Sequence, residues 1–245
     1  MLIWSDKIAR LNADRLCGLS NVRVRYEPDF KPVRLKSHGR RARYVGNFAS
    51  IKAGRSLPWE SGAERIGLER AEVDPHRIDF RAQPFRLSWY NGHRQISYTP
   101  DRLDLNSNGE LECVEVKSDR QALWKPEMVE KLGLVRGLLH AVDVGFKVEF
   151  ASELVRSSGA DFVARVLHHR RTVLEPSDHA ILDGLTSGFT SGFPFGALCE
   201  AYGDEPTAFA KLSGWLVRRR VATTICSDFC EATLIEPICR EVTGV

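Results

Sequence analysis

The chain has 245 residues, of which 43% are hydrophobic and 27% charged, and these values are ordinary for a globular protein. The composition excludes a disordered chain, a collagen-like fibre and a coiled coil. No stretch approaches the ~20 consecutive apolar residues of a membrane helix, and the N-terminus lacks the basic-then-apolar order of a signal peptide. We therefore expect a soluble, cytoplasmic protein.

The net charge of +3 is distributed unevenly along the chain. Residues 1–56 carry 13 Lys and Arg against 4 Asp and Glu, whereas the remainder carries 22 against 28. A basic run of this kind is typical of phosphate binding, because each contact releases counterions from a polyanion. A solvated basic arm is the alternative interpretation. The candidate DNA-binding residues are Arg34, Lys36, Arg40, Arg41 and Arg43.

After the basic segment, the hydrophobic pattern changes from helical to alternating. Residues 60–72 carry apolar side chains at three- and four-residue spacing and are followed by Asp74-Pro75, which predicts a helix. This order of elements indicates an α/β or α+β fold. The alternating residues predict strands at 78–82, 85–89 and 96–98, a hairpin of 101–105 with 111–117, a helix at about 125–140 and a strand at 146–150.

A second region is expected after Ser157-Ser158-Gly159. Its apolar residues predict three helices, followed by a basic end and a β-like stretch at 221–225, and this order fits a winged-helix domain. The expected helices cover 178–186, 195–202 and 206–219. We therefore divide the chain into a basic segment (1–56), a core (57–156) and a small, mostly helical winged-helix-like domain (160–245).

The cysteines are too sparse for a disulfide framework in a chain of this length. Cys226, Cys230 and Cys239 lie close in sequence, which leaves a zinc site as one interpretation. No histidine lies nearby at ligand spacing, so ordinary reduced and partly buried cysteines are favoured.

Two acidic residues and a lysine are predicted to meet on the hairpin. Asp101 begins one strand, and Glu115 lies on its partner with Lys117 two residues later, so Glu115 and Lys117 project from the same face. Carboxylates from adjacent strands can converge on one Mg²⁺, which prefers oxygen ligands. A lysine beside the ion can orient the attacking water or stabilise charge in the transition state. These residues suit phosphodiester hydrolysis, and a surface of cross-strand salt bridges is the alternative.

A third acidic residue lies on the helix that precedes the strands. Glu64 is near the apolar stripe of that helix, where its carboxylate can approach the other two. The alternative is an ordinary helix-face glutamate paired with Arg65 or Arg70. Glu60 and Glu69 are competing candidates for the same role.

Taken in order, these motifs resemble the PD-(D/E)xK nucleases, and more narrowly TnsA, the endonuclease subunit of heteromeric cut-and-paste transposases. The resemblance covers about residues 37–155, and the order of the motifs is more specific than any one of them. They are Ser37-His38-Gly39-Arg40, Glu60-Ser61-Gly62-Ala63-Glu64, Asp74-Pro75, Gln83-Pro84-Phe85, Tyr98-Thr99-Pro100-Asp101 and Val114-Glu115-Val116-Lys117.

The resemblance implies a restriction-endonuclease-like mixed sheet flanked by helices that hydrolyses one DNA strand at each transposon end with Mg²⁺, for which Mn²⁺ substitutes. It implies that Glu64 is the helix acid, Asp101 and Glu115 are the metal ligands and Lys117 is the catalytic lysine. Gln83 is expected to be structural or near the substrate. The implied partners are double-stranded DNA, a DDE-type transposase and an ATPase regulator contacted through the C-terminal domain.

Two other functions stay open at this point. One is a stand-alone nuclease of the same superfamily, acting in defence or repair. The other is a non-catalytic DNA-binding assembly subunit whose nuclease site is vestigial. The first predicts cleavage without a partner, and the second predicts DNA binding without cleavage.

Overall fold

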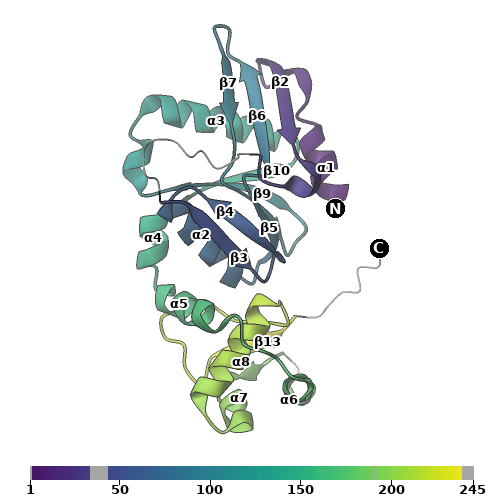
Figure 1. Ribbon diagram of the computed structural model, residues 1–245, viewed down its shortest axis with the longest axis vertical. Coiled ribbons are helices and arrows are strands. Elements are labelled where there is room, and N and C mark those ends of the chain that lie inside the picture. Colours follow the sequence, from purple (N-terminus) through teal and green to yellow (C-terminus); the bar gives the residue numbers. More distant parts are fainter. Residues whose placement is uncertain (1, 34–43, 190, 239–245) are drawn as a thin grey trace. The chain divides into compact units, whose positions relative to one another are not determined.

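The computed structural model describes residues 2–33, 44–189 and 191–238 and is a mixed α/β fold (Figure 1). The chain divides into two compact units. The first comprises Met1–Leu68 with Arg77–Val155, and the second comprises Glu69–His76 with Arg156–Val245. None of the helices in the described ranges is long and apolar enough to cross a membrane.

The first unit is built on a four-stranded sheet with the order β10-β9-β8-β5. Its first three strands in the chain, β5, β8 and β9, pair antiparallel, whereas β9 and β10 run parallel and are connected through helix α3. The elements expected from the sequence in this region are confirmed. Their bounds are α2 Gly62–Val73, β5 Arg77–Ala82, β8 Arg102–Asn106, β9 Leu111–Lys117, α3 Pro126–His140 and β10 Val144–Phe150.

A second sheet, with the order β1-β2-β6-β7, is antiparallel throughout. Its apolar face shares one hydrophobic core with α1, α3 and the first sheet. Phe85, Leu87 and Trp89 of β6 all point into this core, because alternate residues of a strand face the same side. The bounds are α1 Leu2–Ala9, β1 Ala13–Leu16, β2 Leu19–Tyr26, β6 Phe85–Tyr90 and β7 Gln95–Tyr98.

The described part of residues 1–56 is built into the first unit rather than preceding it as a separate arm. Trp4, Ile8 and Val22 are buried in the core, while Arg23 and Arg25 alternate with the inward positions of β2 and are exposed. Strand β2 therefore packs one face into the core and presents arginines to solvent on the other. The remaining elements of this unit are η1 Pro28–Phe30, β3 Gly46–Ser50, β4 Arg55–Trp59, η2 Arg120–Leu123 and α4, which spans Ala151–Arg156.

The second unit is mostly helical and has an aromatic core. Phe162, Phe195 and Phe209 are buried and contact one another or Phe229. Three of its helices confirm those expected from the sequence, but only two residues of the β-like stretch form a strand. The bounds are α5 Ala160–His169, α6 Pro176–Gly188, β11 Phe193–Pro194, α7 Phe195–Tyr202, α8 Glu205–Val217, β12 Val221–Ala222 and β13 Leu234–Pro237.

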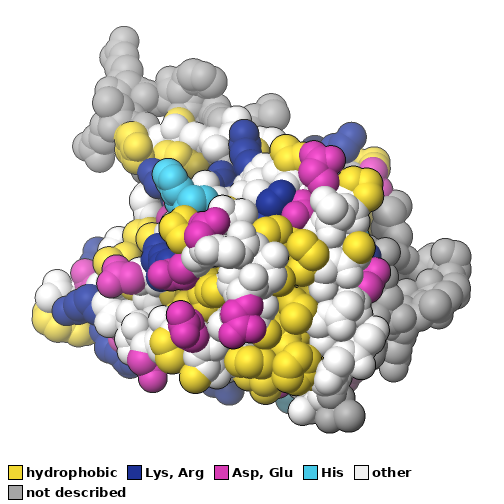
Figure 2. All heavy atoms as spheres, turned by 90° about the horizontal axis from the view of Figure 1, so that it is seen from below, with side chains coloured by type: hydrophobic (Ala, Val, Ile, Leu, Met, Phe, Trp, Pro, Cys, Tyr) yellow, Lys and Arg dark blue, Asp and Glu magenta, His cyan; other side chains and the backbone are white. Residues whose placement is uncertain are grey.

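The surface seen in Figure 2 shows acidic side chains next to an apolar patch. Lys and Arg side chains lie on the same face (Figure 2). The winged-helix-like character of residues 160–245 stays a prediction.

Candidate active site

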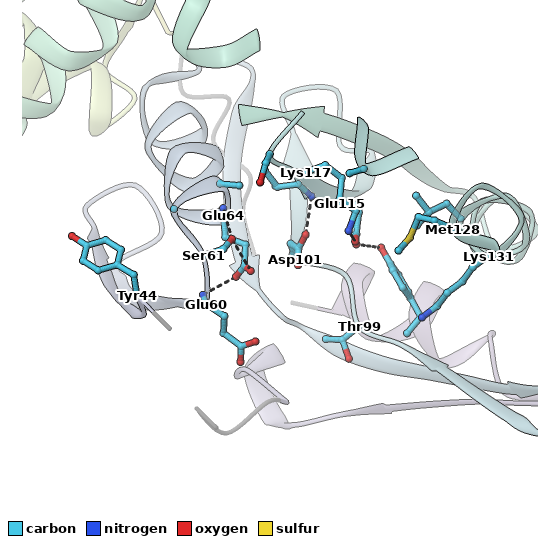
Figure 3. A pocket seen from close by; sticks show the side chains of 17 residues that line it. Tyr44, Glu60, Ser61, Glu64, Thr99, Asp101, Glu115, Lys117, Met128 and Lys131 are labelled. Atoms are coloured by element: carbon cyan, nitrogen blue, oxygen red, sulfur yellow. Dashed lines mark hydrogen bonds and ion pairs between the residues drawn. The ribbon is translucent and has the colours of Figure 1, made fainter. Parts of the chain in front are cut away.

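The four side chains predicted as a catalytic set line one pocket of about 680 Å³ (Figure 3). Glu64 comes from the first turn of α2, Asp101 immediately precedes β8, and Glu115 and Lys117 lie on β9. Residues separated by more than fifty positions in the sequence therefore meet at one place. The pocket is also lined by Tyr44, Glu60, Ser61, Tyr98, Thr99 and Lys131.

Asp101 is held at the end of the β8–β9 hairpin by backbone contacts. Its Oδ2 accepts a hydrogen bond from the Val116 amide at 2.7 Å, and its carbonyl accepts one from the Gln83 amide at 3.0 Å. Its Oδ1 takes no hydrogen bond from the described residues. Burial raises the pKa of Asp101 well above its usual range, and repulsion from Glu115 and Glu64 adds to this effect. Burial and repulsion therefore disfavour the ionised form of Asp101, and a cation bound nearby would favour it.

Glu115 is buried and held from two sides. The Tyr98 hydroxyl donates to its Oε2 at 2.8 Å, and the Lys117 ammonium donates to Oε1. The ion pair confirms that Glu115 and Lys117 project from the same face of β9. Burial, followed by repulsion from Glu115, raises the pKa of Tyr98 well above its usual range, so Tyr98 stays a neutral hydrogen-bond donor.

Glu64 also has a structural role at the start of α2. Its carboxylate accepts hydrogen bonds from the Glu60 amide at 2.9 Å and the Ser61 hydroxyl at 3.1 Å, and its amide donates to Ser61 Oγ at 3.1 Å. Ser61 caps the helix, and the Glu64 carboxylate accepts from the amide that precedes this cap, so the arrangement is a variant of the capping box. Glu60 lines the same pocket, whereas Glu69 belongs to the second unit. Glu64 is thus both a pocket carboxylate and part of the helix cap.

The donor set fits a hard divalent cation. Mg²⁺ typically takes one or two carboxylates and completes its octahedron with water and phosphate oxygens. Asp101 and Glu115 supply carboxylate oxygens, and three pocket carboxylates from the predicted set face one lysine. As these side chains are placed, the described residues contain no group of three or more His, Cys, Asp or Glu ready to hold a metal. Glu64 accepts hydrogen bonds at the start of α2, and Glu115 accepts them from Tyr98 and Lys117.

Arg102, the neighbour of Asp101, belongs to a different cluster. Its buried guanidinium donates to Asp104 at 2.6 and 2.9 Å, to Glu149 at 3.1 Å and to the Gly67 carbonyl at 2.8 Å. Further ion pairs join Arg77 to Asp104 and Glu112, and Lys147 to Glu149. Each of these three cations has a carboxylate partner, and the bond from Arg102 to Gly67 ties α2 to the sheet.

The candidate DNA-binding residues Arg34, Lys36, Arg40, Arg41 and Arg43 all lie outside the described residues. Tyr44, which directly follows Arg43, lines the pocket and is 72% exposed. Its ring lies 5.2 Å from that of Trp59. Tyr44 is the first described residue after this segment.

Gln83 has a structural position behind the site. Its backbone has a positive φ of 47°, which is uncommon outside glycine, and its side chain is buried. The amide donates to Asp101 and the carbonyl accepts from the Val33 amide at 3.0 Å. Gln83 thus connects Val33, three residues after the end of η1, to Asp101.

The cysteines of the second unit do not form a metal centre within the described ranges. Cys226 is half-buried and Cys230 is exposed, and both are free thiols. Cys239 lies outside the described residues.

Sequence reasoning missed three supporting residues. Ser61 carried a signal, because Ser-x-x-Glu before an apolar stretch is the capping-box pattern. Tyr98 carried a weaker one as an inward residue of its strand directly before Thr99-Pro100-Asp101. Lys131, which lies on α3, carried none, since its place at the pocket depends on how that helix crosses the sheet.

No protein-family model matches this chain, and no curated protein is significantly similar to it. Function is therefore inferred from the residues and their geometry.

Proposed function

We propose that this protein is a Mg²⁺-dependent DNA endonuclease of the PD-(D/E)xK type, similar to TnsA, that hydrolyses one strand at each transposon end. The observation that carries the proposal is the meeting of Glu64, Asp101, Glu115 and Lys117 at one pocket with more carboxylates than cations. The order of helix α2, strands β5, β8 and β9, helix α3 and parallel strand β10 supports a restriction-endonuclease-like core.

In this proposal Asp101 and Glu115 hold Mg²⁺, for which Mn²⁺ substitutes. When bound, the cation activates a water and neutralises charge on the phosphate. Tyr98 keeps Glu115 oriented through its hydroxyl. Lys117 exchanges its contact with Glu115 for the attacking water or the scissile phosphate, where its charge stabilises the transition state. Water adds to phosphorus and one P–O bond breaks, leaving a phosphate and a hydroxyl end.

The proposed substrate is double-stranded DNA, bound in part by the basic run that ends at Tyr44. The proposed partners are a DDE-type transposase, which cuts the other strand, and an ATPase regulator contacted through residues 160–245. These partners follow from the resemblance to TnsA and are proposals of the same standing as the activity.

Calorimetric Mn²⁺ binding in the presence of a short DNA duplex tests the site without requiring a partner. We expect Asp101→Asn to lose metal binding, while Glu110→Gln, which changes an exposed carboxylate on the same hairpin, retains it. Thermal unfolding of both variants checks that the fold is kept. Equal Mn²⁺ binding by all three proteins would contradict the proposal and favour a non-catalytic DNA-binding subunit.

Nicking of supercoiled plasmid in Mg²⁺ distinguishes the two enzymatic functions. Cleavage by the isolated chain that is lost in Asp101→Asn favours a stand-alone nuclease. Cleavage that appears only with the transposase and regulator favours the transposase subunit.

A further inference from the structure

A shallow cleft of about 340 Å³ lies on the solvent face of the β1-β2-β6-β7 sheet, away from its apolar core face. No acidic residue lines it within the described parts of the chain. It is lined by Arg23, Arg25, Arg86, Ser88, Gln95 and Ser97, together with Val24. Every one of these polar side chains can donate hydrogen bonds, and three of them are permanently cationic. Such a lining suits a phosphate group.

The strand register places two of these cations directly opposite each other. Arg25 of β2 pairs with Arg86 of β6, and like charges at directly opposed positions destabilise a sheet. Arg25 has an exposed ion pair with Glu27 at 3.0 Å, and such pairs contribute little. No carboxylate in the described ranges pairs with Arg86. The repulsion is therefore poorly compensated within the protein, which is typical of a functional position.

The arginines are displayed on a rigid support. The residues that alternate with Arg86 on β6, Phe85 and Leu87, are fully buried in the core. Arg23 also donates hydrogen bonds to the Ala13 carbonyl at 3.0 Å and to Asp14 at 2.7 Å, although the pair with Asp14 is exposed. The strand that carries Arg86 is therefore anchored in the core.

The cleft adjoins the carboxylate pocket along β7. Ser97 lines the cleft and Thr99, two residues later, lines the pocket, a step of about 7 Å along an extended chain. The β6–β7 pairing ends at Leu87 with Tyr98. Arg86 therefore directly precedes the residue whose strand partner, Tyr98, lines the pocket. Successive phosphates of one strand are spaced 3.4 Å along the axis of duplex DNA.

We propose that Arg25 and Arg86 bind the phosphodiester backbone of double-stranded DNA next to the phosphate that enters the carboxylate pocket. This rests on the proposed nuclease function and adds a binding surface separate from the basic run at 34–43. Arginine suits the role because its planar fork binds phosphate through two parallel hydrogen bonds, and serine hydroxyls commonly add backbone contacts.

The test measures duplex binding by fluorescence anisotropy over a range of salt concentrations, in an Asp101→Asn background that prevents cleavage. Arg25→Gln with Arg86→Gln is compared with Arg10→Gln with Arg136→Gln, which removes two arginines outside both clefts. We expect the cleft double variant to bind at least about tenfold more weakly. We also expect the slope of log affinity against log salt to become shallower by about 2, since each phosphate contact contributes about 0.9. The control pair should change neither quantity.

The cleft variant should unfold at the same or a higher temperature than its parent, because the opposed charges are removed. A salt slope and affinity equal to those of the parent would overturn the proposal, as would tighter arginine-dependent binding to duplex RNA than to DNA. Failure of the nuclease function is seen separately, as Mn²⁺ binding that does not depend on Asp101. If the nuclease function fails in this way but DNA binding still depends on Arg25 and Arg86, the DNA-binding surface is supported and the nuclease function is not.

Discussion

Two clusters of charged side chains lie next to each other in the first unit, and they differ in how their positive and negative charges are paired. The cluster around Arg102 is buried at Arg102, Asp104 and Glu149, and each of its described cations has a carboxylate partner. The cluster around Asp101 lines an open pocket, where Glu64, Asp101 and Glu115 face Lys117. The two clusters contain consecutive residues, Asp101 and Arg102.

This difference in pairing distinguishes charged residues that stabilise the fold from charged residues that are available for function. A buried network is tolerated when each charge is paired and hydrogen-bonded, and it then adds rigidity. In the unbalanced group, burial and then repulsion from Glu115 and Glu64 raise the pKa of Asp101, and a bound cation would favour its ionised form. The balanced cluster should therefore control folding, and the unbalanced one should control metal binding.

The largest expected effect on stability comes from opening the balanced cluster. Arg102→Met leaves Asp104 and Glu149 buried without their shared partner, and we expect a loss of about 3–5 kcal/mol in the free energy of unfolding. Urea denaturation followed by circular dichroism measures it. Arg120→Met removes a surface ion pair with Glu153 and should lose less than about 1 kcal/mol. Equal losses of unfolding free energy in Arg102→Met and Arg120→Met would contradict a special role of the buried cluster in stability.

A smaller effect is expected where α2 approaches the sheet. A Cβ on Gly67 would lie 3.0 Å from Val116 Cγ2 and 3.1 Å from Arg102 Nη1. Gly67→Ala should therefore destabilise the protein by about 1–3 kcal/mol through overpacking. Gly133→Ala is the matched control, since its added Cβ meets nothing within 4 Å, and it should stabilise α3 by up to about 1 kcal/mol. Thermal unfolding of both variants measures the difference, and a stabilised Gly67→Ala would contradict the close approach.

The second unit contains a further buried carboxylate, that of Asp178, whose oxygens accept hydrogen bonds from several partners. Burial alone would raise the pKa of Asp178, but the Lys211 ammonium, the Tyr202 hydroxyl and the Glu175 amide donate to it and hold its pKa below the usual range. Asp178→Asn should lose about 1–3 kcal/mol at neutral pH.

Because the folded-state pKa is lowered, this contribution is present above the unfolded value of about 3.9 and is lost as the pH falls through the lower folded value. The gap in melting temperature between wild type and Asp178→Asn should therefore shrink on acidification. Asp183→Asn changes an exposed position on the same helix. Its melting temperature should equal that of wild type both at neutral pH and after acidification. A gap for Asp178→Asn that is independent of pH would show that ionisation of Asp178 does not matter.

The smallest effect on stability is expected in the unbalanced cluster. Asp101→Asn keeps an oxygen for the Val116 amide and removes repulsion with Glu115 and Glu64. We expect the unfolding free energy at neutral pH to stay within about 1 kcal/mol of wild type, on the stabilising side. Added Mn²⁺ should raise the melting temperature of wild type and leave that of the variant unchanged. A loss of several kcal/mol would assign Asp101 to the fold rather than to a metal.

The local elements of residues 60–150 follow from the sequence pattern alone. Three- and four-residue spacing identified α2 and α3, and alternation identified β5 to β10, because these patterns follow from the geometry of one helix or strand. The same alternation placed Glu115 and Lys117 on one face. The sequence also ordered the four candidate site residues, because their motifs occur in sequence order.

Which charged side chains are paired depends instead on contacts between distant segments of the fold. Alternation sends Asp101 and Arg102 to different sides, but long-range packing of α2 and β10 determines that one side is closed and the other is a pocket. The pairing of β2 with β6, some sixty residues later, drew the N-terminal strands into the core and set Arg25 opposite Arg86. Local pattern cannot specify such contacts, because each depends on the free energy of burial summed over segments far apart in the chain.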